Sequence, residues 1–411
     1  MKKIISIPVL MLFTSTVLGK TIFVGNQQNV KTVQQALLLA VDGDTVLVNA
    51  GHYHEQNIVI DKSIYLIGIN HPVLDGDDKY EVISIKADRV VVDGFKVINS
   101  GISSIEDYAG IKVYNSRYAV IRNNILDKTF FGIYIQYGTN CLIENNAISA
   151  HSKTDQQSGN GIHCWKSDSL RILGNSITGH RDGIYFEFVK NSVIWRNVSE
   201  ANLRYGLHFM FSNDDAYICN VFKNNGAGVA VMFSKGLKMI HNYFEENWGD
   251  AAFGLLLKEI SDGYIENNVF EKNTAGIFME GASRIHMEKN VFKDNGWAMK
   301  IQASCMEVTV HHNNFKGNSF DVGTNGNLVL NYFANNYWDK YEGYDLNRDK
   351  LGDIPYRPVS LYAMIIEQNP PAMILFRSLI TSLLDKTEKI LPSLTPESLK
   401  DEHPLMKPLP L

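Results

Sequence analysis

The sequence has few cysteines, few prolines and no excess of positive charge. Acidic residues (44) outnumber basic residues (39), and the net charge is −5, which argues against a nucleic-acid partner. The 11 prolines among 411 residues argue against low complexity over most of the chain. No cysteine belongs to a Cys-x-x-Cys pair, so the spacing supports neither a disulfide framework nor a metal cluster, and we expect buried, unreactive thiols. The four cysteines are Cys141, Cys164, Cys219 and Cys305.

A mostly apolar run stands at the N-terminus. Lys2 and Lys3 precede the stretch from residue 4 to residue 17, and the small residues Val17 and Gly19 suit cleavage after position 19. The run is too short to span a membrane comfortably. We therefore expect residues 1–19 to be a secretory signal peptide and the mature protein to be periplasmic.

Glycine and asparagine recur along the chain at matched positions. The repeat glycines are separated by 22, 29, 22, 23, 22, 26 and 22 residues, and an asparagine follows each one fourteen positions later. Periods of this size with strand-like units predict a β-helix. The glycines are Gly110, Gly132, Gly161, Gly183, Gly206, Gly228, Gly254 and Gly276, and the asparagines are Asn124, Asn146, Asn175, Asn197, Asn220, Asn242, Asn268 and Asn290.

Strict alternation after each glycine assigns the faces of a strand. The residues one and three positions after the glycine are apolar in every repeat, as in Leu207 and Phe209, so they should point inward. We predict an all-β, right-handed parallel β-helix of about 22-residue coils. Its parts are a cap with the first coils (20–100, with helical spacing from Val33 to Ala40), the repeats (101–338), a closing loop (339–369) and an amphipathic helical tail (370–411).

Asparagine and phenylalanine at fixed offsets predict internal ladders. Asparagine tolerates the left-handed turn conformation and can hydrogen-bond to its copies in neighbouring coils. The phenylalanines two positions after four consecutive repeat asparagines should stack inside the solenoid. They are Phe222, Phe244, Phe270 and Phe292.

The outward positions of the first strand carry an unusual band of side chains. The band holds more aromatic and sulfur-containing side chains than a face that only contacts water, and exposed clusters of this kind mark binding surfaces. It consists of Tyr134, His163, Trp165, Tyr185, His208, Met210 and Met232.

Three interpretations of this band stay open. Met210 and Met232 should be neighbours in adjacent coils with His208 on the same face, and thioether plus imidazole suits Cu(I). The aromatic faces could instead stack on sugars, with Glu187 and Asp182 as acid and base, although they do not form a recognisable glycosidase pair. The third interpretation is a protein interface or a surface shielded by a loop.

Two further segments are candidate metal sites. His286 and Met287, with Met306, His311 and His312, form a second soft cluster near the C-terminal end of the repeats. In the closing loop, a D-x-N-x-D pattern precedes Gly352, which falls two places later than a calcium loop requires. This loop is either a calcium site or a carboxylate-rich turn; its residues are Asp345, Asn347, Asp349 and Asp353.

The tail has helical apolar spacing. Met373, Phe376, Ile380 and Leu384 recur every three or four residues, and charged Arg377 argues against a membrane span. We expect this apolar face to bind a partner: either the last coil of the solenoid or the periplasmic side of a transporter.

The asparagine coils, "NYWDKYEGYD…GDIPYRP" and the tail ending in "HPLMKP" together resemble the NosD family over nearly the whole mature chain. The resemblance implies a periplasmic accessory protein that binds copper, works with the ABC transporter NosF/NosY, receives copper from the lipoprotein NosL and helps assemble the copper–sulfide centre of nitrous oxide reductase, NosZ. It implies no catalytic residues and no enzymatic activity. The alternatives are a polysaccharide lyase or hydrolase on the same scaffold, and a structural adaptor without metal.

Overall fold

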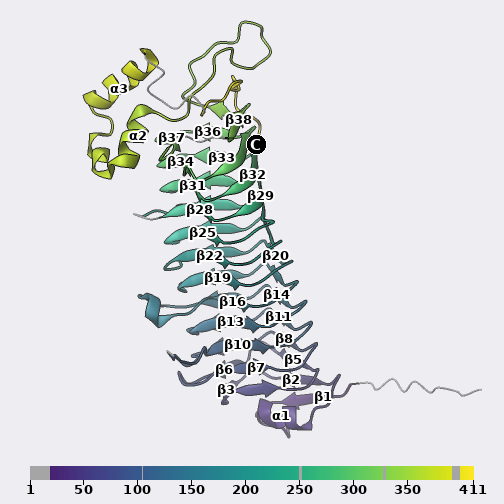
Figure 1. Ribbon diagram of the computed structural model, residues 1–411. Coiled ribbons are helices and arrows are strands. Elements are labelled where there is room, and N and C mark those ends of the chain that lie inside the picture. The colour runs from purple at the N-terminus through teal and green to yellow at the C-terminus, as the bar shows by residue number, and fades with distance from the viewer. Residues whose placement is uncertain (1–18, 104, 250–251, 327–329, 391–398) are drawn as a thin grey trace, which may run out of the picture.

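The chain winds into an elongated solenoid of three parallel sheets (Figure 1). The computed structural model describes residues 19–103, 105–249, 252–326, 330–390 and 399–411, so the expected signal peptide falls almost entirely outside the described residues. Each coil contributes one strand to each sheet, and every strand pairs in parallel with the same strand of the next coil. The predicted parallel β-helix is confirmed.

We name the three sheets A, B and C. Sheet A contains β1 (Thr21–Val24), β2 (Thr45–Val48), β5 (Tyr65–Gly68), β8 (Val91–Asp93), β11 (Val120–Arg122), β14 (Leu142–Glu144), β17 (Arg171–Leu173), β20 (Val193–Trp195), β23 (Ala216–Ile218), β26 (Lys238–Ile240), β29 (Ser261–Glu266), β32 (Ser283–Glu288), β35 (Met306–His311) and β38 (Tyr332–Ala334). Sheet B contains β3 (His52–His54), β6 (Val73–Asp75), β9 (Lys96–Ile98), β12 (Ile125–Asp127), β15 (Ala147–Ser149), β18 (Ser176–Thr178), β21 (Val198–Glu200), β24 (Val221–Lys223), β27 (Tyr243–Glu245), β30 (Val269–Glu271), β33 (Val291–Lys293), β36 (Asn314–Lys316) and β39 (Tyr337–Trp338).

Sheet C holds the strands that open the repeats. It contains β4 (Ile58–Ile60), β7 (Ile83–Ile85), β10 (Ala109–Tyr114), β13 (Phe131–Gln136), β16 (Ile162–Trp165), β19 (Asp182–Glu187), β22 (Tyr205–Met210), β25 (Ala227–Met232), β28 (Phe253–Lys258), β31 (Ala275–Glu280), β34 (Trp297–Ile301) and β37 (Phe320–Gly323). The two columns predicted to point inward, which include Leu207 and Phe209, are fully buried. The alternation therefore assigned the core face of sheet C correctly.

The repeat glycines lie where successive coils approach most closely. A Cβ on Gly206 would lie 2.8 Å from the carbonyl oxygen of Gly228, and a Cβ on Gly228 would lie 2.4 Å from that of Gly254. Real Cβ atoms do not tolerate such contacts with backbone, so glycine is required by close approach rather than by an unusual φ.

Two asparagine ladders and an aromatic stack run through the solenoid. In the first ladder the backbone N–H and the side-chain amide of each asparagine both donate to the side-chain oxygen of the next, as Asn197 does to Asn220 at 2.9 and 3.0 Å. The predicted phenylalanine stack is present, with centroid distances of 5.5, 4.6 and 4.9 Å, and it continues through Phe315 to Trp338. The sequence analysis missed the second ladder, whose members stand five positions after those of the first: Asn202, Asn225, Asn247, Asn273, Asn295 and Asn318.

Both ends of the solenoid are covered. At the N-terminal end, α1 (Val33–Leu39) begins at Thr32, whose hydroxyl accepts from Gln35 N–H, and the Glu55 carboxylate accepts from the N–H groups of Val33 and Gln34. At the other end, residues 399–411 lie against the last coil, where Asp401 forms a bridge with Phe333 and Leu405 one with Tyr337.

The tail differs from the single helical segment predicted over 370–411. After α2 (Leu361–Gln368), the tail forms two helices, the 3₁₀ helix η2 (Pro370–Leu375) and the α-helix α3 (Leu379–Ile390). The break between them contains Arg377, whose φ is +59°. Residues 399–411 are not helical. Within the described ranges, every helix is too short or too polar to cross a membrane.

Candidate metal and partner surfaces

The outer face of sheet C brings the candidate copper ligands together. β22 pairs in register with β25, so Met210 lies directly opposite Met232, and His208 stands two residues before Met210 on the same face. Both methionines are partly exposed, whereas His208 is only 6% exposed. The structure therefore places two thioethers and one imidazole on adjacent coils.

His208 lies beneath two aromatic rings rather than on an open surface. The rings of Tyr185 and Tyr205 contact it, with centroids at 5.0 and 4.8 Å. Its Nδ1 is 3.7 Å from a carboxylate oxygen of Asp182. Among the described residues, neither ring nitrogen of His208 has a hydrogen-bond partner, which leaves the imidazole available to a ligand.

The carboxyl group of Asp182 lies beside His208 below the surface. The residue is fully buried, and the Nε atoms of Arg181 and Arg204 each lie 3.8 Å from one of its oxygens. Neither oxygen accepts a hydrogen bond from the part of the chain that the structure describes. A buried carboxyl group without hydrogen bonds is costly, and an ion or water beside it would lower that cost.

Tyr185 connects the histidine to the methionines. Its hydroxyl donates to Met210 Sδ at 3.7 Å. Burial raises the pKa of Tyr185 to about 12, so the phenol keeps its proton at physiological pH. Tyr185 therefore acts as a donor that orients one thioether.

The prediction that the whole band is solvent-exposed is wrong. Tyr134 and His208 are both buried. The reason is local. In these two coils an aromatic residue directly precedes the repeat glycine, and its ring contacts the outward side chain that stands three positions after that aromatic residue. Phe131 contacts Tyr134 at 5.4 Å, and Tyr205 covers His208. The cover therefore comes from the same strands and not from a loop, which was the kind of shielding raised from the sequence.

His163 does not join the His208 group. Its ring is separated from His208 by Tyr185 on the intervening strand, with which it stacks at 4.8 Å. Its Nδ1 lies 2.9 Å from the side-chain amide of Asn160, and burial lowers its pKa to about 3. The imidazole of His163 is therefore neutral at physiological pH.

The second soft cluster is divided by the pleat of sheet A. Met287 lies in the core with none of its surface exposed, whereas the adjacent His286 points outward and stacks on Tyr264 at 5.2 Å. Consecutive residues of a strand face opposite sides, so these two cannot share one surface ion. The structure instead groups Glu288, His311 and His312, whose ligand atoms lie within 4.8 Å of one another.

An exposed row of phenyl rings borders the methionine pair. Phe188, Phe211 and Phe233 follow the last outward residues of β19, β22 and β25, and neighbouring rings stack at 5.2 Å. All three residues have positive φ, from 51° to 54°, which is uncommon for bulky side chains. This row was not predicted from the sequence, although its three residues share one offset from the repeat glycine.

The tail residues assigned to partner binding divide into two groups. Met373 and Ile380 are exposed. Leu384 packs on α2 and on the end of sheet C, and the Phe376 ring contacts Phe320 at 5.4 Å. The tail therefore contacts its own solenoid and leaves an outer apolar face on η2 and α3.

The closing loop has the carboxylate-rich turn that was one of the two alternatives. Asp345 accepts from the N–H groups of Asp349 and Lys350, at 3.1 and 2.9 Å, and Asp353 accepts from that of Leu346 at 2.6 Å. Calcium binding by this turn stays a prediction.

Comparison with known proteins identifies relatives over most of the chain. A protein of Pseudomonas aeruginosa named "Probable ABC transporter binding protein NosD" is 27% identical over 390 residues, 90% of each chain. The Stutzerimonas stutzeri protein of the same name is 26% identical over 87% of this chain and 86% of its own.

Solved structures with the same fold, all of low sequence identity, include carbohydrate-active enzymes. A family 28 exopolygalacturonase of Yersinia enterocolitica has a TM-score of 0.58 and 10% identity, covering 78% of this chain and 79% of its own. The GH87 alpha-1,3-glucanase of Streptomyces thermodiastaticus has a TM-score of 0.60 and 11% identity, covering 74% and 65%. These likenesses show the β-helix fold alone.

The family model described as "Periplasmic copper-binding protein (NosD)" matches residues 144–344, the part of the solenoid that carries the methionine pair. Together with the relatives that match over most of their length, this shows that the chain is similar to NosD proteins over nearly its whole length.

Proposed function

We propose that this protein is a periplasmic copper-handling partner of an ABC transporter, and that it holds Cu(I) through His208, Met210 and Met232. The observation that carries the proposal is the pairing of Met210 with Met232 across adjacent strands, beside a buried imidazole with no hydrogen-bond partner among the described residues. Copper here is cargo and is held transiently. The family description and the names of the relatives support both the metal and the transporter.

The chemistry of the donor set favours Cu(I) over harder ions. Thioethers are soft, uncharged ligands that suit Cu(I), and imidazole suits it as well. The methionines are partly exposed, so a donor protein can reach them, and His208 lies beneath the surface. We infer that copper arrives at the thioethers and is retained by the imidazole.

The other candidate ligands, His163, His286 and Met287, lie outside this copper site. His163 is isolated by Tyr185, and His286 lies on sheet A, so neither belongs to the copper set proposed here. Met287 is buried in the core and does not reach this surface.

Two apolar surfaces support a role in assembly. We propose that the outer face of η2 and α3, with Met373 and Ile380, contacts the transporter NosF/NosY. The phenyl row beside the methionine pair is suited to proteins that exchange copper there, for which we propose NosL as donor and the reductase NosZ as recipient. The finer role in building the copper–sulfide centre is part of this proposal.

The alternative, a carbohydrate-active enzyme, has less support. An acid–base pair must reach a sugar, yet Asp182 is fully buried and Glu187 is the partly exposed neighbour of Met210. The likeness to glycosidases concerns the fold.

The experiment is a Cu(I) competition titration against a chromophoric chelator under anaerobic conditions. The double variant Met210→Leu/Met232→Leu keeps side-chain volume and removes both sulfurs; we expect its affinity to fall at least about tenfold. Met373→Leu, at an exposed methionine on η2 outside the proposed metal sites, is the matched control and should bind as the wild type does. Equal affinity of the double variant and the wild type would refute the site.

A further inference from the structure

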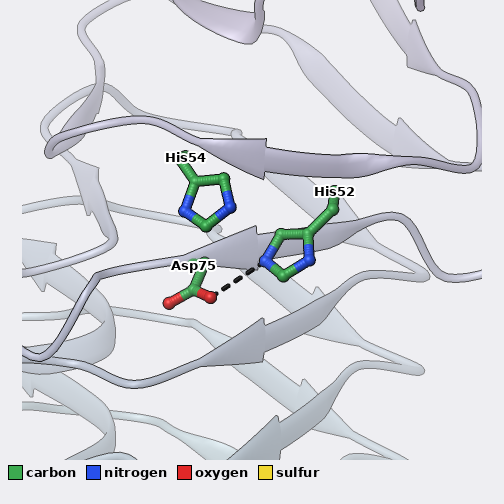
Figure 2. Close-up of side chains that lie close together, drawn as sticks. All are labelled: His52, His54 and Asp75. Atoms are coloured by element: carbon green, nitrogen blue, oxygen red, sulfur yellow. Dashed lines mark hydrogen bonds and ion pairs between the residues drawn. The ribbon is translucent and has the colours of Figure 1, made fainter.

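A second group of possible metal ligands lies at the N-terminal end of the solenoid (Figure 2). His52 and His54 stand on β3, the first strand of sheet B, and Asp75 stands opposite His54 on β6. The two imidazole rings stack with centroids 4.4 Å apart. One ligand atom from each of the three residues lies within 4.8 Å of the others, so the backbone register already assembles two nitrogens and one oxygen.

Asp75 is held in position by hydrogen bonds to its far oxygen. Its Oδ1 accepts from the Asp77 N–H and from the Asn99 side-chain amide, both at 3.0 Å. Its Oδ2 lies 2.9 Å from His52 Nε2. Burial raises the pKa of Asp75, but these hydrogen bonds outweigh it and hold the pKa below its ordinary value. The carboxyl group is therefore buried and fixed with one oxygen toward the histidines.

Asp77 orients the second histidine. Its Oδ1 lies 2.8 Å from His54 Nδ1, and this hydrogen bond raises the pKa of His54. The bond keeps the proton of neutral His54 on Nδ1 and leaves Nε2 as the nitrogen that can bind a metal. A carboxylate that holds the distal nitrogen of a ligand histidine is the usual support of a histidine–metal site.

We propose that His52, His54 and Asp75 form a binding site for a divalent first-row cation of the Zn²⁺ type. Two imidazoles and a carboxylate are borderline to hard donors that suit Zn²⁺, and the set contains no thioether that would favour Cu(I). His52 and His54 are 49% and 57% exposed at the side chain, so the ion would keep a position open to solvent or to a partner's ligand. The group lies at the opposite end of the solenoid from α2 and α3 (Figure 1).

The test is a Zn²⁺ competition titration on the full chain without a histidine tag. The wild type should bind one Zn²⁺ at this site, and His54→Ala and Asp75→Asn should each lower the affinity at least about tenfold. His241→Ala, at an exposed histidine in the turn after β26, is the control and should leave the affinity unchanged. Thermal melts without metal check that the variants fold. Because His54 is exposed, His54→Ala should fold normally, and it tests the site even if Asp75→Asn does not fold.

Two outcomes would overturn the proposal: a wild type that binds no Zn²⁺ at micromolar concentration, or a His54→Ala variant that binds as the wild type does. The Met210→Leu/Met232→Leu variant separates this site from the copper site. It should bind Zn²⁺ normally, so failure of either proposal is visible without the other.

Discussion

Asp401 ends the first asparagine ladder, and its replacement by alanine should destabilise the C-terminal end of the solenoid. Asp401 stands 65 residues after Asn336, where the C-terminal segment packs against the last coil, and its carboxylate is fully buried. Its Oδ2 accepts from the backbone N–H and side-chain amide of Asn336 and from Trp338 Nε1, at 2.9, 3.0 and 3.0 Å. Its Oδ1 accepts from the N–H groups of Asn335 and His403, at 3.0 and 3.2 Å.

The expected cost follows from these five hydrogen bonds. The three donors at Oδ2 are buried, whereas the two at Oδ1 are only partly buried. A buried donor that loses its acceptor costs about 1–3 kcal/mol, so Asp401→Ala should lower the free energy of unfolding by at least about 3 kcal/mol. Asp401→Asn keeps one acceptor oxygen, which can serve the three donors at Oδ2, and should cost about 2 kcal/mol.

The assay is urea denaturation followed by circular dichroism, with hydrogen exchange of the amides of residues 333–338. Exchange is needed because a solenoid can lose its terminal coil before the rest unfolds. Glu402→Ala is the control: this side chain forms a surface ion pair with Lys400, and its loss should change stability by less than about 0.5 kcal/mol. The reasoning would be refuted if Asp401→Ala matched this control and left exchange of the last coil unchanged.

Two further predictions concern the buried core and the tail. Burial raises the pKa of Asp215 to about 8, against an ordinary value of 3.8. The protonated side chain therefore contributes stability below pH 4, and this contribution is lost as the pH rises toward 8. Asp215→Asn should therefore stabilise the protein by about 4 kcal/mol at pH 7 and by little at pH 4; urea denaturation at both values measures this, and equal effects would contradict it. In the tail, Met373→Ser/Ile380→Ser should leave the melting temperature unchanged and abolish co-purification with the transporter, while Leu346→Ser, at an exposed leucine of the closing loop, should not; undiminished recovery of the double variant would count against that surface.

The regular part of the fold could be predicted because identical environments recur in every coil. Alternation after Gly206 places Leu207 and Phe209 in the core, and the asparagine column becomes a ladder since each member meets its copy one coil away. The second ladder, represented by Asn225, carried the same periodic signal and was missed because only the first offset was followed.

Non-repeating contacts could not be predicted in the same way. The cover over His208 comes from Tyr205, and an aromatic residue precedes the repeat glycine in only some of the repeats, so the general repeat pattern does not show it. Asp401 lies far from Asn336 in sequence, and nothing in the tail marks it as the end of a ladder. The group of His52, His54 and Asp75 joins two strands of one sheet edge and has no counterpart in the repeats.

X-ray absorption spectroscopy of the Cu(I)-loaded protein tests the central claim most directly. Two thioethers and one imidazole at His208, Met210 and Met232 predict a copper shell of sulfur and nitrogen, and the sulfur contribution should disappear in Met210→Leu/Met232→Leu. A shell of nitrogen and oxygen alone, or a sulfur shell that persists in the double variant, would contradict the account.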